Sequence, residues 1–184
     1  MKKIKKILTI VLAVLACVSF SGCRSIRSEK LVEDINNHSN FEIDLLTPVG
    51  ECDFEGFGMI PGHGVEGYYD KKYGDITEND TLNASYVQYD VTSYPDIGFG
   101  KKYVTGIYIS DPDIHVYGYS VGDNSEEFSE FLEEKGFKVY YDNGLYRMCS
   151  KGKVKIRCVI DREKQEINSL YVGMDLTNMF SSLY

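Results

Sequence analysis

The sequence predicts an α+β fold in which an antiparallel β-meander carries one amphipathic helix on a face and is preceded by short strands and glycine-rich loops. Apolar and polar residues alternate over 86–92 and 103–109, with the period of half-buried strands. Phe128, Phe131 and Leu132 recur at helical spacing. Four short apolar stretches follow that helix, and strands joined by short turns form an antiparallel meander.

The helix is expected over 125–135. Asn124 or Ser125 can accept hydrogen bonds from the first unpaired backbone amides, and Glu126 favours the positive end of the helix dipole. Gly136 ends the helix, because glycine adopts the left-handed backbone conformation at low cost. The apolar side chains share one face, so we expect that face to pack on the sheet.

The meander is expected to contain strands at 137–141, 145–149, 154–161 and 167–172. Earlier strands are expected at 41–45, 57–60, 65–69, 86–92, 103–109 and 114–119, and the residues that could form one helical turn before them are Leu31, Val32 and Ile35. The glycine-rich segment 51–74 lacks the fixed order of three glycines that a dinucleotide-binding loop requires. We therefore interpret it as turns between short strands.

The middle hairpin of the meander has two possible registers. A two-residue loop would turn Arg147 towards the core and bury its charge. A three-residue loop at 150–152 turns Met148 inward instead, and it is favoured because apolar residues then face each other. In that register Cys158 points into the core and Cys149 points outward, so the two thiols cannot form a disulfide.

The first residues are typical of an export signal. Four lysines precede an apolar stretch at 7–20, whose length of about 21 Å as a helix is shorter than the ~30 Å hydrocarbon layer of a membrane. We expect residues 1–22 to be a signal peptide and residues 23–30 to be a tether. Residues 31–184 are expected to form a single α+β domain.

The signal ends in Phe20-Ser21-Gly22-Cys23, which resembles the lipobox of bacterial lipoproteins. The resemblance implies cleavage before Cys23 and a diacylglyceryl group on its sulfur. It also implies a lipid-anchored protein on the extracytoplasmic side of the cell membrane. Cys17 is a rival lipidation site, but its apolar stretch would be short and the bulky Leu15 would stand two residues before the cut.

The amino-acid composition limits the classes of partner that the protein is expected to bind. Four of the 20 Lys and Arg residues precede residue 23 and none of the 28 Asp and Glu residues does, so the formal net charge of 23–184 is −12. A domain this acidic is a poor candidate for binding nucleic acid or anionic lipid headgroups. Three cysteines follow the anchor, namely Cys52, Cys149 and Cys158, and an odd number cannot all pair within the chain.

From Tyr103 onward the sequence resembles a unit of small envelope lipoproteins. The resemblance rests on Asp111-Pro112-Asp113, Val116-Tyr117-Gly118, Gly122-Asp123, one amphipathic helix closed by Gly136-Phe137, and Lys151-Gly152-Lys153-Val154. It is similar to the helix-plus-sheet units of the β-lactamase inhibitory protein-like and BamE-like folds. Because members of those groups bind proteins or envelope components and are not enzymes, the resemblance implies a non-catalytic binding or interaction module.

The candidate binding residues are Tyr68, Tyr69 and Tyr73, because tyrosine offers a large contact area at low entropic cost. The expected partner is an envelope protein or a cell-wall component. The alternative is a thiol-dependent hydrolase or transferase in which His63 activates Cys52.

We expect no cofactor and no metal. The acidic residues of 75–80 and of 111–113 lack the spacing of a calcium-binding loop. A solvated turn explains each of these clusters.

Overall fold

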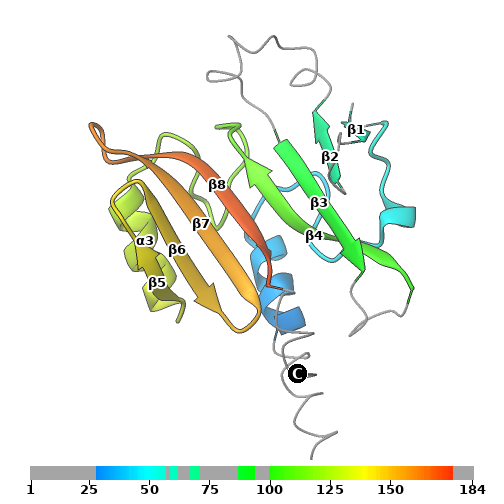
Figure 1. Cartoon of the computed structure of the whole chain (residues 1–184), viewed down its shortest axis with the longest axis horizontal. Coiled ribbons are helices and arrows are strands. Elements are labelled where there is room, and N and C mark those ends of the chain that lie inside the picture. The colour runs from blue at the N-terminus through cyan, green and yellow to red at the C-terminus, as the bar shows by residue number, and fades with distance from the viewer. Residues whose placement is uncertain (1–27, 57–58, 62–66, 71–86, 94–99, 176–184) are drawn as a thin grey trace, which may run out of the picture.

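The computed structural model describes residues 28–56, 59–61, 67–70, 87–93 and 100–175, and these form one antiparallel sheet of eight strands with helices on one side (Figure 1). The strands are β1 Met59–Pro61, β2 Gly67–Asp70, β3 Val87–Ser93, β4 Lys102–Ile109, β5 Lys138–Asp142, β6 Tyr146–Lys151, β7 Val154–Asp161 and β8 Glu166–Met174. Their order in the sheet is β1-β2-β3-β4-β8-β7-β6-β5. The helices are 28–37 and α3 Ser125–Glu134, with a 3₁₀ turn η1 at Val49–Glu51. The α+β class is confirmed.

The helix α3 begins and ends close to where the sequence places its ends. The side chain of Asn124 accepts hydrogen bonds from the amides of Glu126 and Glu127, and Gly136 has a φ of 84° after the last turn. Phe128 and Leu132 are almost fully buried. The helix therefore forms because its cap, its dipole and its apolar face agree.

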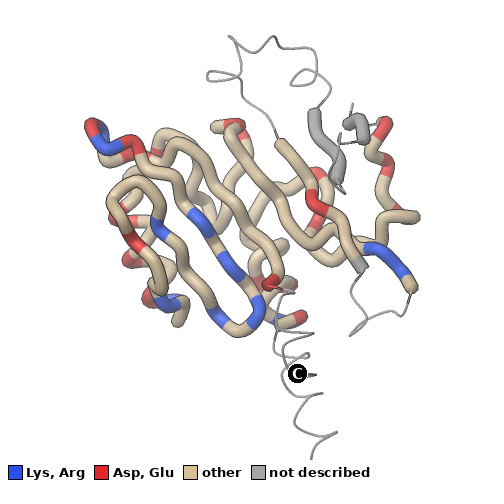
Figure 2. The backbone as a smooth tube through the Cα atoms, in the orientation of Figure 1, with Lys and Arg blue, Asp and Glu red and all other residues tan. Residues whose placement is uncertain are grey.

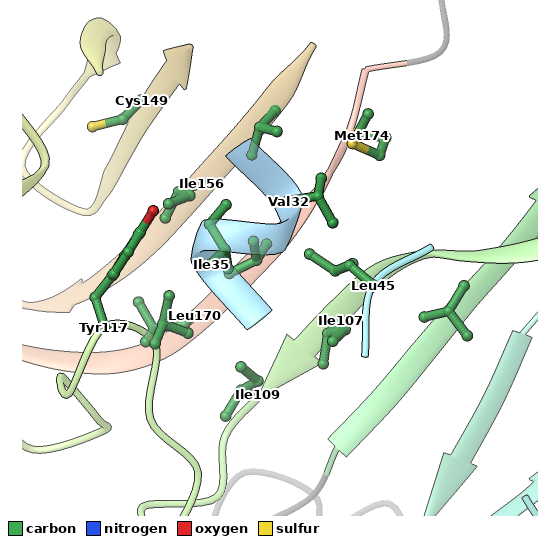
Figure 3. Close-up of a cluster of buried hydrophobic side chains, with 14 of the residues drawn as sticks. Val32, Ile35, Leu45, Ile107, Ile109, Tyr117, Cys149, Ile156, Leu170 and Met174 are labelled. Atoms are coloured by element: carbon green, nitrogen blue, oxygen red, sulfur yellow. The ribbon is translucent and has the colours of Figure 1, made fainter. Parts of the chain in front are cut away.

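A second helix, 28–37, lies on the same side of the sheet as α3 (Figure 1). Figure 3 shows its Val32 and Ile35 among core residues of the sheet such as Ile156 and Leu170. The described part of the chain therefore has two helices on this face, where the sequence predicted one. Residues 28–30, which were expected in the tether, already belong to this helix, and Ser28 is buried.

We call the helix-covered side of the sheet the inner face and the opposite side the outer face. Alternation along the strands sends one set of side chains into the core and the other away from it. The inner set includes Val87, Tyr89, Ile107, Ile109, Val154, Ile156, Cys158, Leu170 and Val172. The outer set includes Gln88, Tyr108, Tyr146, Met148, Lys155, Arg157, Ser169 and Tyr171.

Two segments that were expected to be strands are not strands. In 41–45, Ile43 and Leu45 are buried as the alternation predicted, but the amide and carbonyl of Leu45 bond the side chain of Asn36. In 114–119 the chain reverses, because Tyr117 and Gly118 both have positive φ, as in a type I′ turn. Burial follows the sequence pattern in the first segment, whereas backbone pairing does not.

The predicted register of the hairpin between β6 and β7 is wrong. Lys151 pairs with Val154, so the loop is Gly152-Lys153, and Gly152 has a φ of 61°. Cys149 therefore faces inward and is buried, where the sequence argument placed it outward.

Arg147 also lies on the inner face in this register. Its Nε bonds Asp142 Oδ2 at 2.6 Å and its side chain is 17% exposed. The charge is tolerated because Arg147 is paired and lies next to the edge strand. The objection that a core-facing Arg147 would be an unpaired buried charge therefore does not hold.

The strand β5 forms one edge of the sheet, and all five of its residues are exposed. Its pairing with β6 shifts register between Val139 and Tyr141, so that Tyr140 is an extra residue in a β-bulge. Val139, Tyr140 and Tyr141 are large exposed residues of this edge.

Phe128→Ala should lower the free energy of unfolding by about 3–5 kcal/mol, because it removes a fully buried ring between α3 and the sheet. Phe131→Ala is the matched control, since Phe131 is only partly buried and should cost clearly less. Urea denaturation of both variants measures the difference. Equal losses would contradict the packing of α3 described above.

Candidate binding surface

The outer face carries a continuous row of directly opposed residues. From β3 to β5 the row reads Gln88, Tyr108, Tyr171, Arg157, Met148 and Tyr141. Both described helices lie on the inner face, so no described helix covers this row (Figure 1). We call these six residues the outer-face row.

The ring of Tyr171 lies over a pair of glycines. Gly106 and Gly173 are directly opposed in β4 and β8, and a Cβ atom on either would come very close to the Tyr171 hydroxyl. The missing side chains therefore leave the space that this ring occupies. Burial, and then the negative charge of Asp90 and a hydrogen bond with it, raise the pKa of Tyr171 to about 12, so the hydroxyl stays protonated at neutral pH.

Arg157 is the central cation of the row. Its guanidinium carbon lies 5.3 Å from the ring centroid of Tyr171 and 6.0 Å from that of Tyr108, which are cation–π distances. Among the described residues, its buried Nε has no hydrogen-bond partner and its guanidinium has no ion-pair partner. The two rings therefore lie beside a planar cation whose Nε donor is not used by the described part of the protein.

The neighbouring outer-face side chains continue this aromatic and cationic character. The Lys155 ammonium lies 5.7 Å from the ring centroid of Tyr140 and 2.8 Å from Asp175. The Tyr140 hydroxyl donates to the Met148 sulfur at 3.5 Å. Tyr140 is 49% exposed and Tyr146 37%, so this end of the row offers aromatic surface to a partner.

Opposite charges are concentrated on different elements of the domain. The stretch 146–160 contains five Lys and Arg residues and no Asp or Glu, whereas α3 carries five glutamates, all exposed. Figure 2 shows the Lys and Arg residues gathered along β6 and β7. The β6–β7 hairpin is therefore basic although the net charge of the chain is negative.

The predicted aromatic site is described only in its backbone. The register pairs Tyr68 with Tyr89 and Tyr69 with Gln88, while the side chains of Tyr68 and Tyr69 lie outside what the structure describes, as does Tyr73. Cys23, its signal peptide and the rival Cys17 also lie outside the described residues.

Sequence reasoning missed Tyr108, Arg157 and Tyr171. A usable signal existed, because each occupies a position where its strand alternation places a side chain away from the core. Bringing them together requires β4 to pair with β8, and α3 and the strands β5, β6 and β7 separate these two strands in the sequence.

Cys52, which the alternative hypothesis pairs with His63, does not have the properties of a nucleophile. The Cys52 thiol donates to the carbonyl of Pro48 at 3.3 Å. Partial burial and the nearby Glu51 raise its pKa, whereas an activated cysteine has a lowered one. His63 lies outside the described residues.

The two core thiols share one small void. It measures about 10 Å³, and its lining includes Cys149, Cys158, Phe128 and Leu132. Burial raises the pKa of Cys149 to about 11 and that of Cys158 to about 12. Cys52, Cys149 and Cys158 are all unpaired.

An acidic groove of about 360 Å³ lies beside the helix 28–37. Its lining includes Glu29, Glu33 and Asp44, and burial raises the pKa of Asp44. Among the described residues no group of three or more His, Cys, Asp or Glu side chains is placed to hold a metal ion. The acidic residues of 75–80, which the sequence predicted to form a solvated turn, lie outside the described residues.

The helices of the described part are too short or too polar to cross a membrane. No family model matches the chain, and no curated protein does.

Among solved structures the chain is similar to an extracellular protein containing an SCP domain from Bacillus anthracis str. Ames, with 10% identity and a TM-score of 0.46. The match covers 79% of this chain and 50% of that one, so the chain spans about half the length of that protein. This likeness is too low to carry an argument about function.

In the folded protein Cys149 and Cys158 should react with iodoacetamide at pH 8 at least about a hundredfold more slowly than in the unfolded chain, because burial suppresses both access and thiolate formation. Peptide mapping after timed alkylation measures this, with Cys52 as the half-buried internal reference. Rapid labelling of Cys149 would contradict its buried position and would support the outward orientation that was predicted from the sequence.

Proposed function

We propose that this protein is a membrane-anchored surface lipoprotein and a non-catalytic binding module, whose outer-face row binds an anionic group of an envelope protein or cell-wall component. The observation that carries the proposal is Arg157, whose guanidinium lies within cation–π distance of both Tyr108 and Tyr171 and whose Nε has no hydrogen-bond partner among the described residues. A guanidinium in this position matches carboxylate and phosphate oxygens, which it can bind through two parallel hydrogen bonds.

The energetics favour an external partner for Arg157. A buried polar group without a hydrogen bond costs free energy, and a hydrogen bond to a charged group recovers about 1.5–3 kcal/mol. The described residues do not satisfy the Nε of Arg157. An anionic ligand at the guanidinium would add a charge-assisted contact that the described residues do not supply, and the neighbouring rings would exclude water from this contact.

The composition of the row also suits recognition. Tyrosine and arginine are enriched among the residues that dominate binding energy at interfaces. Here Tyr108, Tyr171 and Arg157 form the centre, while the exposed Tyr140 and Tyr146 lie towards the edge. A rigid sheet holds all of them, so little ordering is needed when a ligand binds.

The placement at the membrane rests on the lipobox-like end of the signal at Cys23. A lipid on Cys23 would hold the domain on the extracytoplasmic side of the cell membrane, where envelope proteins and wall components are the available partners.

The thiol-enzyme alternative has less support. Its nucleophile would be Cys52, whose thiol bonds the Pro48 carbonyl and whose pKa is raised. A hydrolase or transferase that used this thiol would require the opposite shift.

Arg157→Gln should reduce capture of the envelope partner by about 10- to 100-fold, because it removes a charge-assisted contact of about 1.5–3 kcal/mol. The measurement is photo-crosslinking on intact cells, with a photoreactive amino acid replacing the exposed Tyr140 and mass spectrometry of the adduct.

Arg162→Gln is the matched control, since Arg162 is an exposed arginine in the turn that follows β7. A photoreactive residue in place of Glu130 on α3 reports the opposite face and should yield no adduct of the same partner. Equal capture by the Arg157→Gln and Arg162→Gln variants would refute the role of the outer-face row.

Cys23→Ala should leave uncut precursor without lipid, because the sulfur that receives the diacylglyceryl group is absent. Membrane fractionation and intact-mass measurement test this, with Cys17→Ala as the control that should process normally. An unmodified Cys23 in a mature product cut at another bond would contradict the anchor.

A further inference from the structure

The outer-face row contains a methionine that solvent can reach. Met148 lies on β6 and is partly exposed. Met174, by contrast, is 8% exposed and belongs to the core. The side chains of Met59 and Met179 lie outside what the structure describes. Among the described side chains, Met148 is therefore the thioether that a solute reaches most readily.

The sulfur of Met148 already has a hydrogen-bond donor beside it. The Tyr140 hydroxyl donates to this sulfur at 3.5 Å, and Tyr140 itself is 49% exposed. The β-bulge makes this contact possible, because Tyr140 is the extra residue next to Tyr141, the register partner of Met148. A thioether sulfur is only a weak acceptor. The hydroxyl is therefore placed to bond a better acceptor at the same position.

The described cysteines compete poorly with this thioether for an oxidant. Burial raises the pKa of Cys149 to about 11 and that of Cys158 to about 12, and partial burial and Glu51 raise the pKa of Cys52. Oxidation of a cysteine proceeds through its thiolate, which is scarce at neutral pH when the pKa is raised. A thioether has no proton to lose, so its lone pair is available at any pH.

We propose that Met148 is a modification site, at which hydrogen peroxide forms methionine sulfoxide and the Tyr140 hydroxyl then bonds the new oxygen. The sulfur lone pair attacks one peroxide oxygen, and the O–O bond breaks. The second oxygen leaves as hydroxide and takes the proton of the first, which gives water. The sulfur is thereby oxidised and the peroxide is reduced.

The position of Met148 suits a sulfoxide, whereas a core position does not. The sulfoxide oxygen is a polar acceptor, and at Met148 both the Tyr140 hydroxyl and solvent can satisfy it. At Met174 the same group is buried among apolar side chains, which costs free energy. Oxidation at Met148 therefore changes the surface of the protein and leaves the core intact.

The consequence for binding rests on the proposed function of the outer-face row. Met148 directly opposes Arg157 in the row and lies beside the exposed Tyr140 and Tyr141. Methionine sulfoxide replaces a flexible apolar contact by a polar one and disrupts interfaces that use methionine. The oxidised row therefore binds the envelope partner more weakly, and methionine sulfoxide reductases restore the thioether.

The first experiment measures oxidation in the processed protein purified from cells, with Met59→Leu and Met179→Leu so that Met148 and Met174 are compared. After a timed pulse of hydrogen peroxide, peptide mapping should show sulfoxide at Met148 forming at least about tenfold faster than at Met174, because exposure controls access. In urea-unfolded protein the two rates should converge. Equal rates in the folded protein, or faster oxidation of Cys52 than of Met148, would overturn the proposal.

The second experiment tests the hydrogen bond to the new oxygen. In protein with ¹³C-labelled tyrosine, oxidation should shift the Cζ resonance of Tyr140, because its hydroxyl gains a stronger acceptor. Tyr141 is the internal control, since it is similarly exposed and its hydroxyl accepts from Asn143. Met148→Leu should show neither shift after the same pulse. Equal shifts of both tyrosines, or no shift of Tyr140, would contradict the proposed contact.

The third experiment measures binding on intact cells, with a photoreactive amino acid replacing the exposed Tyr146. A peroxide pulse before irradiation should lower the adduct yield severalfold. Met148→Leu should keep the full yield with and without the pulse, because leucine preserves the apolar contact and forms no sulfoxide. Met148→Gln, which is polar and resists oxidation, should give the low yield without any peroxide. An equal loss in the Met148→Leu variant would show that the peroxide acts elsewhere.

This inference and the proposed function fail separately. Normal capture by the Arg157→Gln variant refutes the binding role of the row, while peptide mapping still decides whether Met148 is the modification site. Weakened capture by that variant, together with a Met148 that resists peroxide, keeps the row and refutes the modification site.

Discussion

The pairing of β4 with β8 holds the two halves of the molecule together. On the inner face it sets Ile107 opposite Val172 and Ile109 opposite Leu170, and all four are fully buried. Without this pairing, the strands before α3 and the meander after it would be separate sheets, each with an open edge. The helix 28–37 covers the same junction, where Figure 3 shows Ile35 near Ile107 and Leu170. The core and the outer-face row both depend on this one ladder.

Local signals explain which parts of the fold the sequence could predict. The helix α3 was predicted because its cap and Gly136 act within a few residues, and β6, β7 and β8 were predicted because short turns separate alternating stretches. The β4–β8 ladder was not predicted, because no local signal specifies a pairing across some sixty residues. The hairpin register was wrong for a different reason. It treated Arg147 as an unpaired charge, whereas Asp142 was available on the neighbouring strand to pair with it.

The candidate site also combines a part that the sequence could predict with a part that depends on long-range strand pairing. The sequence favoured tyrosines as recognition residues, and tyrosines do occupy the outer face, but the central ones are Tyr108 and Tyr171. Their partner Arg157 reads in the sequence as an ordinary solvent-facing strand residue. Its significance arises only when three strands bring two rings to one guanidinium and leave its Nε without an acceptor. Such a site forms only when the sheet assembles, so no local sequence motif identifies it.

The bulge at Tyr140 has a consequence for contacts between copies of the folded chain. An edge strand with exposed valine and tyrosine side chains is the kind of template on which neighbouring chains polymerise. Continuous pairing with a second strand needs evenly spaced amides and carbonyls, and the register shift between Val139 and Tyr141 interrupts that spacing. Lys138 and Asp142 place charges at the two ends of the same short strand. The free edge of β5 is therefore a poor template for adding a strand from a second copy of the chain.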